Sequence, residues 1–160
     1  MKTEKNKLVF IVEDNEMYSL MLDYALSNDS VVKYMDFKTG EECLENLNLN
    51  PMLIILDYWL PGINGLETFK KIKKYNPKIP VVILTHDHSR ETAVRLLNEG
   101  VKNYFNKEKE SVPKIKEIIN LELFKITEAE EKQIFKIKAV VCFLCLIALI
   151  TVVFYVYQFW

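Results

Sequence analysis

Short apolar runs alternate with stretches that place apolar residues at helical spacing, and this alternation limits the fold more than any other feature. The runs occupy residues 7–12, 31–35, 52–56, 81–84 and 102–105, and each is typical of a buried strand. The first intervening stretch carries apolar residues at Met17, Leu20, Met21, Tyr24 and Ala25, and the third carries them at Leu66, Phe69 and Ile72. Strand-helix alternation predicts an α/β fold with five parallel strands and helices on both faces of the sheet.

Helix start and stop signals agree with this pattern. Thr39 and Ser89 can each cap a helix, with Glu42 and Thr92 three residues later, and Gly100 is suited to end the fourth helix. The folded domain is therefore expected to cover residues 1–123.

The chain changes character after residue 123. Residues 124–138 are charged and helix-forming and predict a helical linker, whereas residues 139–160 carry no charge. As a helix the second segment would be about 33 Å long, close to the ~30 Å hydrocarbon core of a bilayer. A soluble core helix would keep a polar face, so we expect one transmembrane helix. Lysines lie only on the N-terminal side of this helix, and Tyr155, Tyr157 and Trp160 lie near its C-terminal end. This distribution predicts that the folded domain faces the cytoplasm.

Composition excludes several other classes. A net charge of -1 gives no broad attraction to nucleic acid. The first apolar run is too short for a signal peptide. Cys43, Cys142 and Cys145 form no disulfide or zinc pattern, and an apolar helix around the last two would not stabilise a thiolate.

Acidic residues follow two of the expected strands. Glu13 and Asp14 end the first strand and Asp57 ends the third. Because the functional edge of such a sheet is the one where its strands end, all three should converge there. Clustered carboxylates repel each other, and Mg²⁺ with its preference for oxygen ligands is the economical way to neutralise them.

Two further strand ends complete the expected site. Thr85 closes the fourth strand with a hydroxyl, and Lys107 lies just beyond the fifth with a mobile positive charge suited to phosphate. Together with the acidic residues, these groups point to phosphoryl transfer onto a carboxylate.

The same residues in this order resemble the receiver domain of two-component response regulators. The resemblance covers about residues 7–123 and rests on four motifs: Glu13-Asp14, Asp57-Tyr58-Trp59-Leu60-Pro61-Gly62-Ile63-Asn64-Gly65, Thr85, and Tyr104-Phe105-Asn106-Lys107. It implies a flavodoxin-like doubly wound fold and a signalling phosphoacceptor rather than an enzyme. The expected partner is a sensor histidine kinase or a histidine phosphotransfer protein.

The resemblance also implies a role for each residue. Asp57 would take the phosphoryl group. Asp14, Asp57 and the main-chain carbonyl of Trp59 would bind Mg²⁺, and Glu13 would hold a metal-bound water. Thr85 and Lys107 would contact the phosphoryl oxygens. Tyr104 would turn inward as the switch aromatic and change a protein-binding surface.

Departures from the family pattern keep alternatives open. His86 stands where a small residue is usual, and Glu108 replaces a common proline. A phosphorylation-independent scaffold at the membrane is the main alternative. A hydrolase with an aspartate nucleophile would need a second acid where Trp59 stands, and a flavodoxin-like electron carrier would not place acidic residues beside a flavin phosphate. Output is expected through a downstream protein contact.

Overall fold

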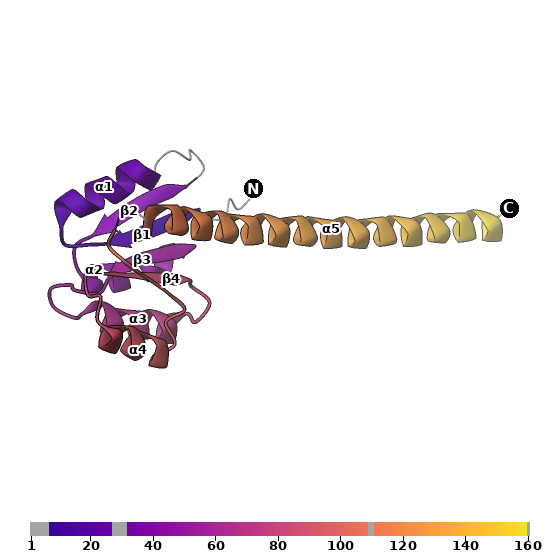
Figure 1. Ribbon diagram of the computed structural model, residues 1–160. Coiled ribbons are helices and arrows are strands. Elements are labelled where there is room, and N and C mark those ends of the chain that lie inside the picture. Colours follow the sequence, from indigo (N-terminus) through magenta and orange to yellow (C-terminus); the bar gives the residue numbers. More distant parts are fainter. Residues whose placement is uncertain (1–6, 27–31, 109–110, 160) are drawn as a thin grey trace. The chain divides into compact units, whose positions relative to one another are not determined.

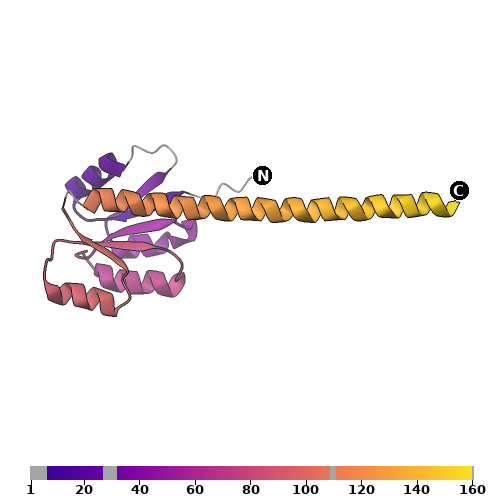
Figure 2. The same ribbon diagram turned by 45° about the vertical axis from the view of Figure 1, so that its right-hand side comes forward.

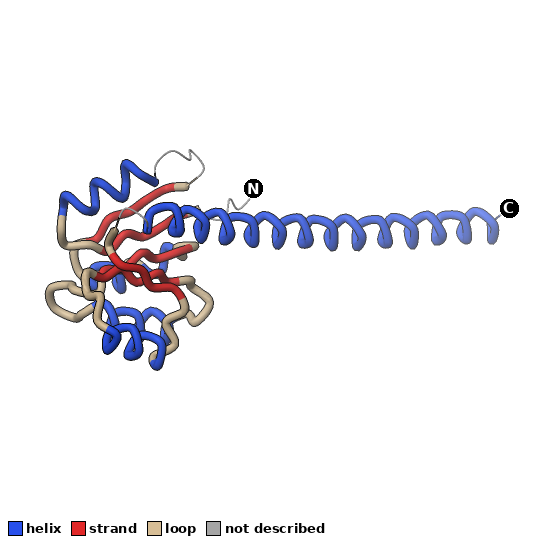
Figure 3. Tube along the Cα trace, in the orientation of Figure 1, coloured by secondary structure: helices blue, strands red, loops and turns tan. Residues whose placement is uncertain are grey.

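The computed structural model describes residues 7–26, 32–108 and 111–159, and its central feature is one parallel sheet (Figures 1 and 3). The strands follow the order β2-β1-β3-β4-β5, which confirms the expected flavodoxin-like α/β fold. Their bounds are β1 Leu8–Val12, β2 Lys33–Phe37, β3 Leu53–Asp57, β4 Val81–Thr85 and β5 Asn103–Asn106. The helices are α1 Glu16–Leu26, α2 Gly40–Glu45, the 3₁₀ turn η1 Leu47–Leu49, α3 Gly65–Tyr75, α4 Arg90–Asn98 and α5 Ser111–Phe159.

Helices cover both faces of this sheet. Figures 1 and 2 show α1 on one side and α2, α3 and α4 on the other. Alternate strand residues such as Phe10, Ile54 and Ile83 join the core beneath α2, α3 and α4. Their neighbours along each strand are buried as well, as expected for strands that have helices on both sides. The central strands are therefore apolar throughout, and charge appears only where they end.

The second strand begins later than its sequence predicted. The expected range was 31–35, whereas β2 covers Lys33–Phe37 and Val31 lies outside the described residues. β2 is an edge strand whose register is set by β1, with Lys33 opposite Leu8 and Phe37 opposite Val12. Pairing with its neighbour, rather than local hydrophobicity, decides where this strand lies.

Helix α1 packs through a different face from the one its sequence predicted. Met17 and Tyr24 are 77% and 86% exposed, and Leu20 and Met21 are exposed too. The buried residues are Ser19, Leu22 and Leu26. The Ser19 hydroxyl donates a hydrogen bond of 2.7 Å to the Asp36 carboxylate on β2. Helix α3, in contrast, buries Leu66, Phe69 and Ile72 as expected.

The helix boundaries confirm the predicted caps. The side chains of Thr39 and Ser89 accept hydrogen bonds from the main-chain N–H groups of Glu42 and Thr92. Gly100 follows the end of α4 with a φ of 81°, in the left-handed region that glycine tolerates best.

The chain divides into two units, Met1–Glu122 and Leu123–Trp160. Within the second unit, the described residues are helical up to Phe159. Its apolar segment exposes nearly all of its large side chains, including Phe143, Leu149 and Phe154. This helix is long and apolar enough to cross a membrane by length and composition. Trp160, expected near the far interface, lies outside the described residues.

Candidate functional site

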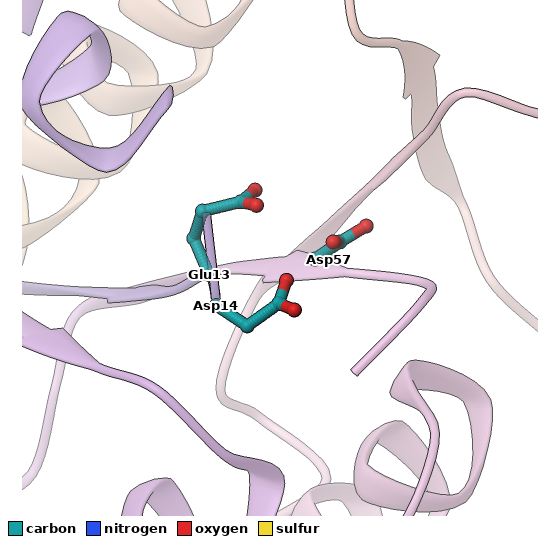
Figure 4. A group of neighbouring side chains, drawn as sticks. All are labelled: Glu13, Asp14 and Asp57. Carbon is teal, nitrogen blue, oxygen red and sulfur yellow. The ribbon is translucent and has the colours of Figure 1, made fainter. Parts of the chain in front are cut away.

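Three carboxylates meet at the edge where the strands end. One oxygen each from Glu13, Asp14 and Asp57 lies within 4.8 Å of the others, and Figure 4 shows the three side chains as neighbours. Glu13 and Asp57 are buried while Asp14 is exposed. The cluster is thus open to solvent on the side of Asp14.

Strand pairing explains why these residues meet. Val12 of β1 is paired with Leu56 of β3, so the residues that follow them, Glu13 directly after β1 and Asp57 at the end of β3, lie side by side. The main-chain N–H of Glu13 donates to the carbonyl of Phe37 on β2, which holds the turn between β1 and α1 against the sheet. The predicted convergence of Glu13, Asp14 and Asp57 is therefore observed.

Lys107 reaches into the same cluster from the loop after β5. Its Nζ lies 2.6 Å from Oε2 of Glu13 and 2.7 Å from Oδ2 of Asp57, and its side chain is only 2% exposed. Its main-chain N–H donates to the carbonyl of Thr85, which fixes the loop beside the end of β4. Buried ionic groups must be paired, and this lysine is paired with two carboxylates.

The electrostatic balance remains unfavourable for the carboxylates. Burial raises the pKa of Glu13 above its ordinary range, and the charge of Asp57 acts in the same direction, while the ion pair with Lys107 opposes both. The only polar contact of Oε2 of Glu13 among the described residues is that ion pair. Three carboxylates facing one ammonium group leave an excess of negative charge that a bound cation would neutralise.

Thr85 lies at the end of β4 and Tyr104 lies within β5, as the sequence predicted. Thr85 is buried, and its hydroxyl oxygen accepts a hydrogen bond from the N–H of Asp87. No described residue accepts the hydrogen of that hydroxyl. Tyr104 is half-buried, lies opposite Ile83 of β4 and packs against the core. Its inward movement as a switch stays a prediction.

Trp59 flanks Asp57 in the loop after β3. Its main-chain N–H donates to Oδ1 of Asp57 at 3.2 Å, so the loop bends back toward the carboxylate. Its indole is 60% exposed and makes an edge contact with the ring of Tyr58. The proposed metal-binding role of the Trp59 carbonyl stays a prediction.

Gly65 has a structural role that sequence reasoning did not assign. A Cβ atom added there would lie 2.1 Å from the carbonyl oxygen of Asp57 and 2.8 Å from Cα of Tyr58. The N–H of Gly65 donates to the Tyr58 carbonyl, and Asn64 caps α3 through the N–H of Glu67. Helix α3 therefore begins against the backbone of Asp57. The glycine in the loop motif was the available signal.

The two departures from the family pattern lie in neighbouring loops. His86 is exposed and makes an edge contact with the ring of Tyr18. The carboxylate of Glu108 lies 3.8 Å from His88, a pair that carries opposite charges only when the histidine is protonated. The main-chain carbonyl of Glu108 accepts the hydroxyl of Ser111 at the start of α5. Glu108 is thus joined to the start of α5 by a hydrogen bond.

The residues present fit Mg²⁺. All three members of the acidic cluster offer hard oxygen ligands, and oxygen-rich sites with one or two carboxylates are typical of this ion. Lys107 supplies a positive charge suited to phosphate oxygens at the same place. The arrangement can therefore gather a cation and a phosphoryl group at Asp57.

Comparison with known proteins gives a consistent result. Residues 9–120 match the family model of the response regulator receiver domain. The DNA-binding transcriptional regulator NtrC of Escherichia coli K12 is 31% identical over 101 residues, which cover 62% of this chain and 21% of NtrC. Response regulator protein VraR of Staphylococcus saprophyticus is 32% identical over 101 residues, which cover 62% of this chain and 48% of VraR.

Solved structures agree with this match. The structure of the phosphorylated cyanobacterial phytochrome response regulator RcpA aligns with a TM-score of 0.61 and 27% identity, over 71% of this chain and 89% of RcpA. The curated relatives are longer proteins, and the chain spans about a fifth of NtrC and about half of VraR. What the chain shares with them is one domain.

Proposed function

Because the chain belongs to the response regulator receiver domain family, we propose that it is a membrane-anchored phosphoacceptor of a two-component phosphorelay. Asp57 accepts the phosphoryl group from a sensor histidine kinase or a histidine phosphotransfer protein. The observation that carries this proposal is that Asp57 lies in one cluster with the carboxylates of Glu13 and Asp14 and in contact with the ammonium group of Lys107. The protein acts as a signalling component and not as an enzyme with a separate substrate.

The proposed reaction is a displacement at phosphorus. A carboxylate oxygen of Asp57 forms the new O–P bond while the N–P bond of a phosphohistidine breaks, and the electron pair stays on the imidazole nitrogen. Lys107 moves its ammonium group from the two carboxylates to the phosphoryl oxygens. The Thr85 hydroxyl donates its hydrogen to another of those oxygens. Tyr104 then turns inward behind Thr85, which changes the surface formed by α4, β5 and α5.

Mg²⁺ is the cofactor that this site is proposed to hold. Asp14, Asp57 and the main-chain carbonyl of Trp59 would hold the ion directly, and Glu13 would act through water. The ion supplies positive charge that offsets the charge of the phosphoryl group when it is bound.

A phosphate-affinity gel tests the proposal. The full chain in detergent is incubated with acetyl phosphate and Mg²⁺, and we expect a retarded band that is absent when a chelator replaces the metal. Treatment with hydroxylamine should remove the band, because an acyl phosphate reacts with it. If no donor produces a band, the chain is the phosphorylation-independent scaffold that His86 and Glu108 kept as an alternative.

The exposed face of α1 is a candidate surface for the phosphodonor protein. Met17, Leu20, Met21 and Tyr24 are exposed and recur at the spacing of one helical face. Tyr18, on the first turns of the same helix, has its ring 4.8 Å from the ammonium group of Lys107. An apolar helix face is suited to pack against helices of a partner, so we propose that the donor docks here.

Replacing Leu20 and Tyr24 together with alanine should weaken phosphorylation in cells by about 10-fold, since a buried interface contact contributes on the order of 1–2 kcal/mol. Phosphorylation by acetyl phosphate in vitro should stay unchanged, because the small donor needs no docking surface. Phosphate-affinity gels of cell extracts and of purified protein measure the two effects. Val94→Ala on α4, which also changes an exposed apolar side chain, is the control. Equal loss with both donors would contradict the docking role.

The C-terminal segment is proposed to cross the membrane once, with the receiver domain in the cytoplasm. Residues 124–138 form the helical linker and residues 139–160 the transmembrane helix. Support comes from an unbroken helix whose most apolar stretch has a mean hydropathy of 3.0 and contains no buried residue. Such a helix is costly to expose to water, and tethering raises the concentration of the domain near membrane partners.

Membrane insertion has a direct biochemical test. We expect the full chain to stay in the membrane pellet after alkaline carbonate extraction and to leave it only with detergent. A chain ending at Lys138 should be released into the soluble fraction. Protease added to sealed vesicles with the cytoplasmic side outward should digest the receiver domain. Release of the full chain by carbonate would contradict a membrane-spanning helix.

A further inference from the structure

The ammonium group of Lys107 has a third neighbour besides the two carboxylates. Its Nζ lies 4.8 Å from the centroid of the Tyr18 ring, within the range in which an aromatic face attracts a cation. Glu13 and Asp57 contact the same nitrogen at 2.6 and 2.7 Å. Lys107 is therefore held by two charged partners and one aromatic partner.

Tyr18 is placed by the same turn that carries the acidic residues. The N–H of Tyr18 donates to the side-chain oxygen of Asn15, and the N–H of Asn15 donates to Oε1 of Glu13. The turn between β1 and α1 thus fixes Glu13 and the start of α1 together. Any movement of this turn would move both groups that surround Lys107.

The position of the Tyr18 side chain is not explained by a hydrogen bond of its hydroxyl group. It is buried and makes no hydrogen bond of good geometry with a described residue. The nearby Ser111 hydroxyl donates to the carbonyl of Glu108. Burial raises the pKa of Tyr18 above its ordinary value, with a smaller opposing effect from Ser111. The side chain is therefore neutral at physiological pH, and its contact with Lys107 is made by the ring.

We propose that Tyr18 is a positioning residue for phosphotransfer, whose ring holds the Lys107 ammonium group beside Asp57 while its ionic partners change. This inference rests on the phosphoacceptor function proposed above. Lys107 must leave the carboxylates when the phosphoryl group arrives, and a lysine side chain is long and flexible. Attraction to a ring face does not require one fixed donor-acceptor geometry, so it persists while the ammonium group shifts.

The ring of Tyr18 also contacts the ring of His86. The ring centroid of His86 lies 6.3 Å from that of Tyr18 at an interplanar angle of 65°. The ring that attracts Lys107 therefore also touches the residue that follows Thr85. Tyr18 links the loop after β4 to the lysine in the loop after β5.

Substitutions of Tyr18 distinguish the contribution of its ring from that of its hydroxyl group. Tyr18→Phe keeps the aromatic face, whereas Tyr18→Leu and Tyr18→Met keep only an apolar side chain. The first readout is the NMR shift of the Lys107 ε-methylene protons in the full chain in detergent, because an aromatic face displaces them upfield. The displacement should persist with phenylalanine and disappear with leucine or methionine.

The second readout is the rate of phosphorylation by acetyl phosphate with Mg²⁺. Leucine or methionine should lower the maximal rate by about 3- to 10-fold, as expected for a partly desolvated cation-π contact, and phenylalanine should stay within about 2-fold of the wild type. Tyr75→Leu, an exposed tyrosine at the end of α3, is the control.

Two outcomes would overturn the proposal: an unchanged Lys107 shift in both ring-free variants, or a phenylalanine variant that loses as much rate as leucine. Failure of the phosphoacceptor function would look different. The wild type would then show no phosphorylation at all, and the ε-methylene shift would still decide whether the ring holds Lys107.

Discussion

Asp57→Asn abolishes the retarded band in a phosphate-affinity gel, whether the donor is acetyl phosphate or the kinase in cells. The amide lacks the nucleophilic carboxylate that would form the acyl phosphate. The fold should survive the change, because asparagine can still accept the hydrogen bond from the Trp59 N–H. The charge of Asp57 helps to raise the pKa of Glu13, so its loss also removes an unfavourable repulsion between the two carboxylates.

Asp36→Asn is the matched control for this result. Asp36 lies near the end of β2, toward the same edge of the sheet, and accepts a hydrogen bond from Ser19. It lies outside the acidic cluster. The control should keep the wild-type band. A band that persists in Asp57→Asn would place the phosphoryl group on another residue and contradict the proposed acceptor.

Gly65→Ala should destabilise the receiver domain by about 3 kcal/mol, at the upper end of the usual cost of overpacking. The added Cβ would meet the carbonyl oxygen of Asp57 and Cα of Tyr58 at distances far below van der Waals contact. Both obstacles are backbone atoms that cannot move aside as a flexible side chain would. Urea unfolding in detergent, followed by Trp59 fluorescence in a Trp160→Phe background, measures the loss.

Gly100→Ala provides the comparison for the glycine variant. Gly100 has a φ of 81° and no atom within 4 Å of an added Cβ, so alanine there is strained only by its backbone conformation, at about 1 kcal/mol. Gly65→Ala should therefore be clearly less stable than Gly100→Ala. Equal stability of the two variants would show that α3 can move away from Asp57 at little cost.

The positions of the acidic residues could be predicted from sequence because of a simple geometric rule. Parallel strands end at one edge, so residues that follow buried strands gather there. Glu13, Asp57 and Lys107 obey this rule and lie in direct contact or close to it. The neighbourhood of each residue follows from its place at the end of a strand and needs no knowledge of side-chain packing.

Helix α1 shows where sequence reasoning failed. Most of its residues are apolar, including Met17, Leu20 and Leu22, so helical periodicity alone did not identify the buried face. Packing selected Leu22 and Leu26, and a hydrogen bond to Asp36 made Ser19 part of the buried side. The exposed apolar face, and with it the proposed docking surface, follows from this choice.

The sequence by itself determined the five-strand alternation, the carboxylates at the strand ends and the uncharged C-terminal segment, because these depend on local order along the chain. Only the tertiary structure decided which face of α1 is buried, why residue 65 must lack a side chain, and that the Tyr18 ring faces Lys107. Those features depend on contacts that form only when the elements pack, and neither helical periodicity nor the order of the strands specifies them.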